Sequence, residues 1–97
     1  GTALIPACER GHIAVVTELL KDQNYPIDHI NRLGWTALLE AVILGDGSDK
    51  YVKIVQLLVN AGCDISIKDK DGVDALSHAK KRNFKEITAV LEEAAKK

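Results

Sequence analysis

An acidic stretch flanked by glycine, Gly45–Lys50 (GDGSDK), is the segment whose residue types most readily suggest chemistry. An EF-hand calcium loop needs oxygen ligands at positions 1, 3 and 5, glycine at 6 and glutamate at 12. Counting from Asp46 puts Ser48 at position 3 and Lys50 at position 5. Tyr51 then stands at position 6, so the pattern fails, and the G-x-x-x-x-G-K-[S/T] phosphate loop is absent as well. We therefore interpret the stretch as a turn between two helices, with an ion or small-ligand site as the alternative.

A second acidic stretch, 69–72 (DKDG), fails the same comparison. Asp69 and Asp71 can stand at positions 3 and 5 of a calcium loop. Ile67 then stands at position 1 and His78 at position 12, where neither provides a suitable oxygen. Asp and Gly are favoured in tight turns, so this stretch is interpreted as a turn.

The histidines and serines predict no catalytic site. No serine has the context of a nucleophile elbow. Ser77 and His78 are adjacent, but neighbouring side chains on a helix point about 100° apart and cannot form a dyad. The other histidines, His12 and His29, have no nucleophile at a useful spacing. We therefore expect a protein that is not an enzyme and that holds no cofactor.

The composition is that of one small globular domain. The 97 residues are 46% hydrophobic and only 4% aromatic, so the core must consist of Leu, Ile, Val and Ala. A net charge of −1 gives no general case for nucleic acid or for an acidic membrane. Cys8 and Cys63 lack partners at metal-ligand spacing and are interpreted as small buried residues, which fits a reducing, cytoplasmic setting. The longest apolar run, Ala41–Leu44, is far too short to span a membrane.

The sequence contains three similar units. A similar segment occurs at 2–7 (TALIPA), 36–41 (TALLEA) and 74–79 (DALSHA). An apolar stripe recurs at 15–20 (VVTELL), 54–59 (IVQLLV) and 87–92 (ITAVLE). The unit is therefore about 33 residues long, with one extra residue near 23–26 and five extra residues near 45–50.

Each unit predicts two short helices. The first helices are expected at about 3–10, 37–44 and 75–82, and the second at about 13–21, 51–61 and 84–95. Thr2, Thr36 and Asp74 precede the first helices and are predicted to cap them. At the acidic turn, Gly45 is expected to end one helix, and Ser48 or Asp49 is expected to cap the next. Gly34 and Gly72 are expected to have positive φ angles in the junctions between units. Because such short helices are marginal alone, the units must stack as a solenoid.

These residues resemble the ankyrin repeat, whose pattern is D-x-x-G-x-T-P-L-H-x-A-A, then G-H-x-x-I-V-x-x-L-L, then G-A-D-V-N. The resemblance covers essentially the whole chain and is closest at Ile54–Gly72 and at 11–16 (GHIAVV). It implies an all-α solenoid of about three helix–turn–helix repeats with short β-hairpin-like junction turns, at about 1–30, 31–68 and 69–97. The His of T-P-L-H is absent from all three units, and the first junction, 21–30 (KDQNYPIDHI), lacks G-A-D, so we expect that junction to be less regular.

The two ends of the chain differ in polarity. Lys80, Thr88 and Glu92 stand where apolar residues would face a further repeat, which is typical of a polar C-terminal cap. The first unit begins at the cap of its helix, so we expect that upstream sequence has been removed. The chain is expected to be a monomer, with the uncapped first repeat as a route to self-association.

The resemblance implies a non-catalytic module that binds a protein partner through the concave surface of hairpin tips and inner helices. The residues expected there in the first junction and its helix are Ile30, Arg32, Leu33, Trp35, Ile43 and Leu44. Those in the next are Lys68, Lys70, Asp71, Val73, Lys81 and Arg82. Trp35 beside Leu33 and Arg32 has the composition of a binding hot spot. Two alternatives stay open. In the first, Trp35 only packs against neighbouring repeats, and the basic residues only face solvent. In the second, Asp46 and Asp49 bind an ion or a small ligand. Neither nucleic acid nor a membrane is expected as a partner.

Overall fold

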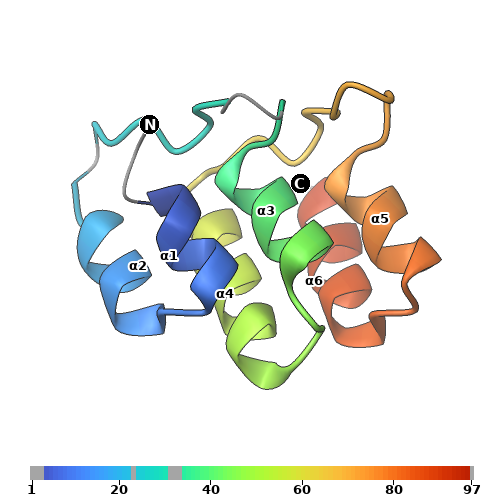
Figure 1. Cartoon of the computed structure of the whole chain (residues 1–97), viewed down its shortest axis with the longest axis horizontal. Coiled ribbons are helices and arrows are strands. Elements are labelled where there is room, and N and C mark those ends of the chain that lie inside the picture. Colours follow the sequence, from blue (N-terminus) through green and yellow to red (C-terminus); the bar gives the residue numbers. More distant parts are fainter. Residues whose placement is uncertain (1–3, 23, 31–33, 97) are drawn as a thin grey trace.

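Six helices follow one another in three antiparallel pairs in the computed structural model, which describes residues 4–22, 24–30 and 34–96 (Figure 1). The helices are α1 (Leu4–Arg10), α2 (Ile13–Leu19), α3 (Ala37–Leu44), α4 (Asp49–Asn60), α5 (Ala75–Lys81) and α6 (Lys85–Ala95). The regular structure of the described residues is entirely helical, which confirms the all-α class. The junction turns therefore contain no β-strand within those ranges.

The helices form two layers. The first helices of the pairs, α1, α3 and α5, pack side by side as an inner row, and α2, α4 and α6 form an outer row behind them (Figure 1). Small residues permit the close approach of the inner helices: Ala7, Ala41 and Ala79 are all buried. Leu39 and Ile54 are fully buried between the layers. The core is thus aliphatic, as the composition predicts.

Side chains predicted to cap the inner helices do so. The Thr36 hydroxyl accepts a hydrogen bond from the Leu39 amide at 3.3 Å, and the Asp74 carboxylate accepts one from the Ser77 amide at 2.8 Å. Each bond satisfies an amide that the first turn of a helix leaves without a partner. The third predicted cap, Thr2, lies outside the described residues.

The insertion near 45–50 changes the second pair. The helix α4 begins at Asp49, two residues before the start expected from the repeat spacing (about 51) and directly after Ser48, one of the two residues predicted to cap it. Ser48 occupies the N-cap position without a side-chain capping bond. Its amide instead donates to the Asp46 carboxylate at 2.9 Å, which closes the turn before the helix.

The two end faces of the stack differ in the residues that they expose. On the last pair, Lys80 and Glu92 form an exposed ion pair at 4.0 Å. On the first pair, Val15 is 43% exposed, whereas the residues at the same repeat position, Ile54 and Ile87, are fully buried. The helices that carry Ile54 and Ile87, α4 and α6, each pack against the outer helix of the preceding pair.

Candidate functional site

The residues predicted to bind a partner lie on the inner helices and on the junctions that precede them. Two of them, Arg32 and Leu33, fall outside the described residues. Of the rest, two apolar side chains are prominent: Ile30 is 51% exposed and Leu44 is 45% exposed. Lys68, Lys70, Asp71, Lys81 and Arg82 are exposed as well, and Trp35, Ile43 and Val73 are half-buried.

At the junction tips, the structure brings the Lys70 side chain against Gly34, the residue before Trp35. Trp35 packs partly against the core and follows Gly34, which has the expected positive φ of 82°. A Cβ atom on Gly34 would lie 2.8 Å from Cγ of Lys70, so the lysine stem runs directly across this glycine. The tip of the second junction therefore lies against the tip of the first.

The second junction is closed by Asp69. Its Oδ1 accepts hydrogen bonds from the amides of Asp71 and Val73 at 2.9 and 3.0 Å, and its own amide donates to the Val73 carbonyl. Its Oδ2 lies 2.7 Å from Nε2 of His78, and the Asp69 side chain is 5% exposed. The amide of Val73, followed by His78, lowers the pKa of Asp69. The stretch 69–72 is thus a turn tied to α5, as interpreted from the sequence.

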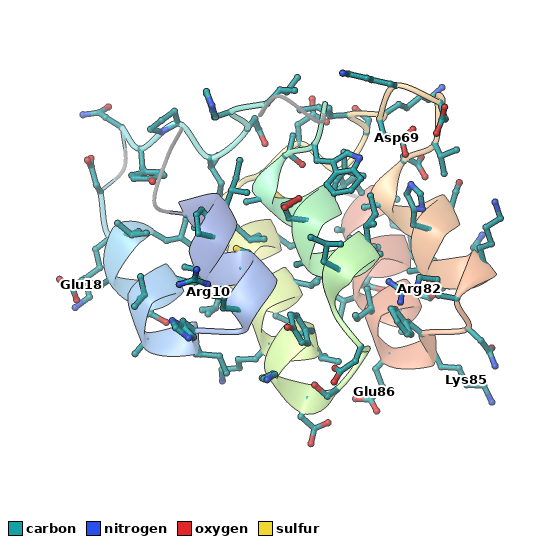
Figure 2. The ribbon with its side chains drawn as sticks, viewed as in Figure 1. Arg10, Glu18, Asp69, Arg82, Lys85 and Glu86 are labelled. Carbon is teal, nitrogen blue, oxygen red and sulfur yellow. The ribbon has the colours of Figure 1, made fainter. Side chains whose placement is uncertain are left out.

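At the other end of the inner helices, Arg82 joins α5 to α3. Its Nη1 donates a hydrogen bond to the carbonyl oxygen of Val42 at 2.9 Å and another to that of Ile43. The guanidinium carbon also lies 4.8 Å from the centre of the Phe84 ring, a cation–π contact (Figure 2 shows Arg82). Because α3 ends at Leu44, these carbonyls belong to its last turn, where a cation is favoured.

The predicted residues therefore form two groups and not one cluster. Trp35 and Lys70 lie at the N-terminal ends of the inner helices, and Ile43, Leu44 and Arg82 lie at the C-terminal ends. The eight residues of α3 separate the groups by about 12 Å at 1.5 Å per residue. A partner that touches both groups must follow the inner helices along their length.

The acidic stretch contacts both neighbouring helix pairs, and we call residues 45–50 the clasp loop. A Cβ atom on Gly47, whose φ is 77°, would lie 2.6 Å from a ring carbon of Phe84 in the third pair. In the other direction, the Lys50 stem would lie 2.8 Å from a Cβ on Gly11 in the first pair. The clasp loop is thus the turn between α3 and α4 that the sequence predicts, and it also bridges the turns on both sides.

Within the described ranges, no three His, Cys, Asp or Glu side chains are grouped in a way that could hold an ion. The Asp46 carboxylate in the clasp loop is bonded to Ser48, and the hydrogen bonds from that residue lower its pKa. Its Oδ1 therefore takes part in closing the turn.

Sequence reasoning missed two side chains that fix the first junction. The Tyr25 hydroxyl accepts a hydrogen bond from the Leu4 amide at 3.2 Å, in the first turn of α1. The Asp28 carboxylate accepts one from the Asp64 amide at 2.9 Å, which ties the first junction to the second. Both residues lie in the segment that lacks the G-A-D motif.

The two cysteines are not in a disulfide. Cys8 is fully buried and Cys63 is half-buried. Burial, followed by the charges of Cys63 and Glu40, raises the pKa of Cys8 to about 12. Burial, followed by the charges of Asp28 and Asp64, raises the pKa of Cys63 to about 12. The thiol and not the thiolate is therefore favoured at both positions, which fits packing residues.

Comparison with known proteins identifies the architecture. The family description "Ankyrin repeats (3 copies)" matches residues 1–69. A putative ankyrin repeat protein of Escherichia coli, YahD, is 44% identical over 91 residues, which are 94% of this chain and 45% of YahD. In the described ranges, no helix has the length and apolar character needed to cross a membrane.

Two solved structures agree closely with the fold. An ankyrin repeat domain from Acinetobacter baumannii superposes with a TM-score of 0.95 and 49% identity, over 98% of this chain and 48% of that one. An Enterococcus ankyrin repeat protein superposes with a TM-score of 0.91 and 47% identity, over 95% of this chain and 46% of that one. The chain thus spans about half the length of these relatives. The three stacked helix pairs, the capped inner helices and these matches together show that the chain belongs to the ankyrin repeat family.

Proposed function

We propose that this chain is a non-catalytic module that binds a protein partner along its inner helices and junction tips. Ankyrin repeat domains generally serve as protein-interaction modules. The observation that carries the proposal is the exposure of large apolar side chains at both ends of this surface. Ile30 at the tip end is 51% exposed, and Leu44 at the far end of α3 is 45% exposed.

The surface combines such apolar groups with fixed charges. Trp35 provides a half-buried aromatic side chain whose exposed part a partner can cover. Lys68 and Lys81 add positive charge on the side of the third helix pair. Because Arg82 and the capping residues already hold the inner helices in place, little conformational entropy is lost when a partner binds.

The test is affinity capture from the source lysate with the wild type and the double variant Trp35→Ala, Leu33→Ala. Both proteins are first melted to check that the variant remains folded. A control is Val15→Ala, which removes an apolar side chain, 43% exposed, from the outer helix α2. We expect a partner that the wild type and the Val15 variant retain and the double variant loses.

The opposite result is equally informative. Retention of the same partner by the folded double variant contradicts binding at the junction tips. The binding surface would then be sought on the clasp loop and the outer helices. Stabilisation of the protein by added divalent cations would instead favour the ion-binding alternative at Asp46 and Asp49, since a ligand of the folded state raises its melting temperature.

A further inference from the structure

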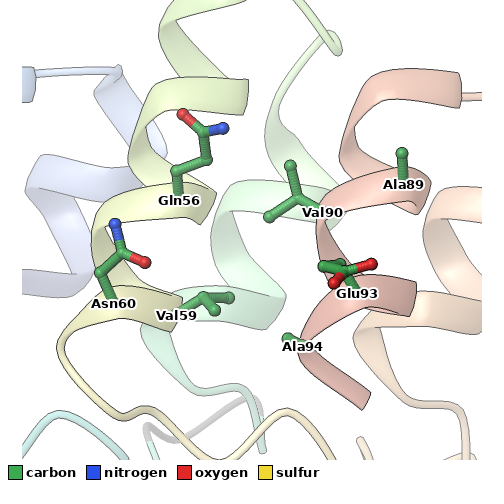
Figure 3. Close-up of a pocket in the computed structure, with 7 residues that line it drawn as sticks. All are labelled: Gln56, Val59, Asn60, Ala89, Val90, Glu93 and Ala94. Atoms are coloured by element: carbon green, nitrogen blue, oxygen red, sulfur yellow. The ribbon is translucent and has the colours of Figure 1, made fainter. Parts of the chain in front are cut away.

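The outer helices carry a row of hollows on the side away from the proposed partner surface. The largest lies between α4 and α6 and has a volume of about 540 Å³. Val59 and Val90 provide its apolar lining, and Gln56, Asn60 and Glu93 provide its polar groups (Figure 3). Nothing in the function proposed above uses this hollow.

Two smaller hollows adjoin the first. One of about 290 Å³ shares Val59 and Asn60 with it and extends to Cys63 and Ile65 in the second junction. Another of about 300 Å³ shares Asn60 and extends to Asp22 in the first junction. All three meet at Asn60, the last residue of α4. We call this row, which runs across the C-terminal ends of α2, α4 and α6, the outer groove.

The length of the outer groove suits an extended chain. Packed helices lie about 8–10 Å apart, so the row from α2 to α6 spans roughly 20 Å. An extended peptide advances about 3.3 Å per residue and would cross it with about six residues.

The polar groups of the outer groove match a peptide backbone. A side-chain amide offers both donors and acceptors, as an extended backbone does. Among the described residues, neither Gln56 nor Asn60 makes a side-chain hydrogen bond within the protein. Both amides can therefore turn to a bound chain, while Val59 and Val90 cover its apolar side.

The charge of the outer groove is negative. In the described ranges, the charged side chains that line the three hollows are Asp22 and Glu93, at opposite ends of the row. Glu93 also lies 4.0 Å from Lys96, but both side chains are more than two-thirds exposed, and such pairs are weak. Asp28 and Asp64 act electrostatically on Cys63, which lines one hollow, and so add negative potential there.

We propose that the outer groove binds an extended, basic peptide segment of a protein partner. Its basic side chains pair with Asp22 and Glu93, and its backbone bonds to the amides of Gln56 and Asn60. This site is separate from the inner surface, so the chain can hold two partners at once or two segments of one.

The test uses a fluorescein-labelled hexapeptide with arginine at both ends and uncharged residues between, and its counterpart with glutamate at both ends. Fluorescence anisotropy at low salt should show saturable binding of the arginine peptide alone. The double variant Asp22→Asn, Glu93→Gln should weaken binding about fivefold, since each exposed ion pair contributes modestly. The control Glu86→Gln, Glu92→Gln removes the same charge from α6 outside the outer groove and should bind as the wild type does.

Melting curves first establish that the variants remain folded. The side-chain amide resonances of Gln56 and Asn60 should shift in NMR spectra when the arginine peptide is added. The folded Trp35→Ala, Leu33→Ala variant should bind the peptide unchanged. The proposal is overturned by the absence of binding at millimolar peptide, by equal weakening in both charge variants, or by loss of binding in the Trp35 variant, which would move the peptide to the inner surface.

Discussion

The guanidinium of Arg82 donates a hydrogen bond across 40 residues of sequence to the carbonyl oxygen of Val42 at 2.9 Å. It also bonds the Ile43 carbonyl, so one side chain satisfies two carbonyls at the end of α3. Those groups have no partner within a helix. A side chain of the third helix pair therefore completes the hydrogen bonding of the last turn of α3.

Replacing Arg82 with alanine should lower the free energy of unfolding by about 1–2 kcal/mol, because charged hydrogen bonds to the last turn of α3 are lost. Urea unfolding followed by circular dichroism measures this change. Lys81→Ala removes the neighbouring exposed charge and should change the stability by less than about 0.5 kcal/mol. Equal effects of the two substitutions would contradict a capping role for Arg82.

Replacing Gly47 with alanine should destabilise the protein by about 2 kcal/mol or more. The residue has φ of 77°, and the new methyl group would lie 2.6 Å from the Phe84 ring. Gly62→Ala is the control, since Gly62 has φ of 91° but no atom near its Cβ position. It should cost only about 1 kcal/mol of backbone strain.

The contact itself can be isolated in a Phe84→Ala background. There, the cost of Gly47→Ala should fall to that of Gly62→Ala, because the ring no longer meets the methyl group. Thermal or urea unfolding of the four proteins gives the coupling energy. An unchanged cost would show that the clasp loop does not act through Phe84.

Acid should destabilise the fold through Asp69. The Val73 amide, followed by His78, lowers the pKa of Asp69 in the folded protein, so folding favours its ionised form. The stability from this group is present above its unfolded pKa of about 3.9 and is lost as the pH falls through the lower folded pKa. Melting temperatures of Asp69→Asn, measured from about pH 7 to about pH 2, should therefore be lower at neutral pH and should depend less on pH. Asp71→Asn, in the same turn, should retain the pH dependence of the wild type.

Neither cysteine should react readily in the folded protein. Burial is the main cause that raises the pKa values of Cys8 and Cys63 to about 12, and the thiolate is the nucleophile. Mass spectrometry after iodoacetamide treatment at about pH 8 should find both unmodified in buffer and both alkylated in urea. The raised pKa values also make the free energy of unfolding depend on pH, because the unfolded protein loses these thiol protons more readily than the folded protein does. The contribution of the thiols is fully present below their unfolded pKa of about 8.5 and is lost as the pH rises toward about 12. Rapid labelling of Cys63 in buffer would show that its junction opens locally.

The helices could be predicted from the sequence because local signals and repetition agree. The caps Thr36 and Asp74, and the turn residues Gly34 and Gly72, act within a few residues of themselves, so their roles follow from local chemistry. For α4 the two signals differ: the repeat spacing predicts a start at about 51, because the five inserted residues have no counterpart in the other units, whereas a cap at Ser48 predicts the observed start at Asp49.

The contacts between units could not be predicted in the same way. The guanidinium of Arg82, which stays a predicted partner-binding residue, also reaches a backbone carbonyl of another helix pair, a contact that has no signature in sequence. The same holds for the Tyr25 hydroxyl, which accepts a hydrogen bond from the Leu4 amide. The expected partner surface itself stays a prediction, and the outer groove depends on side chains from three helices that no short motif links.

The arrangement of the helices also determines how unfolding should spread through the molecule. The principal contacts of α1 and α2 are with each other and with the second pair, and the third pair packs on the second from the other side. The second pair, α3 and α4, is therefore the one through which the outer pairs are thermodynamically coupled. Amide hydrogen exchange should be faster in the outer pairs, α1 with α2 and α5 with α6, than in α3 and α4. It should rise in all six helices when the second pair is weakened.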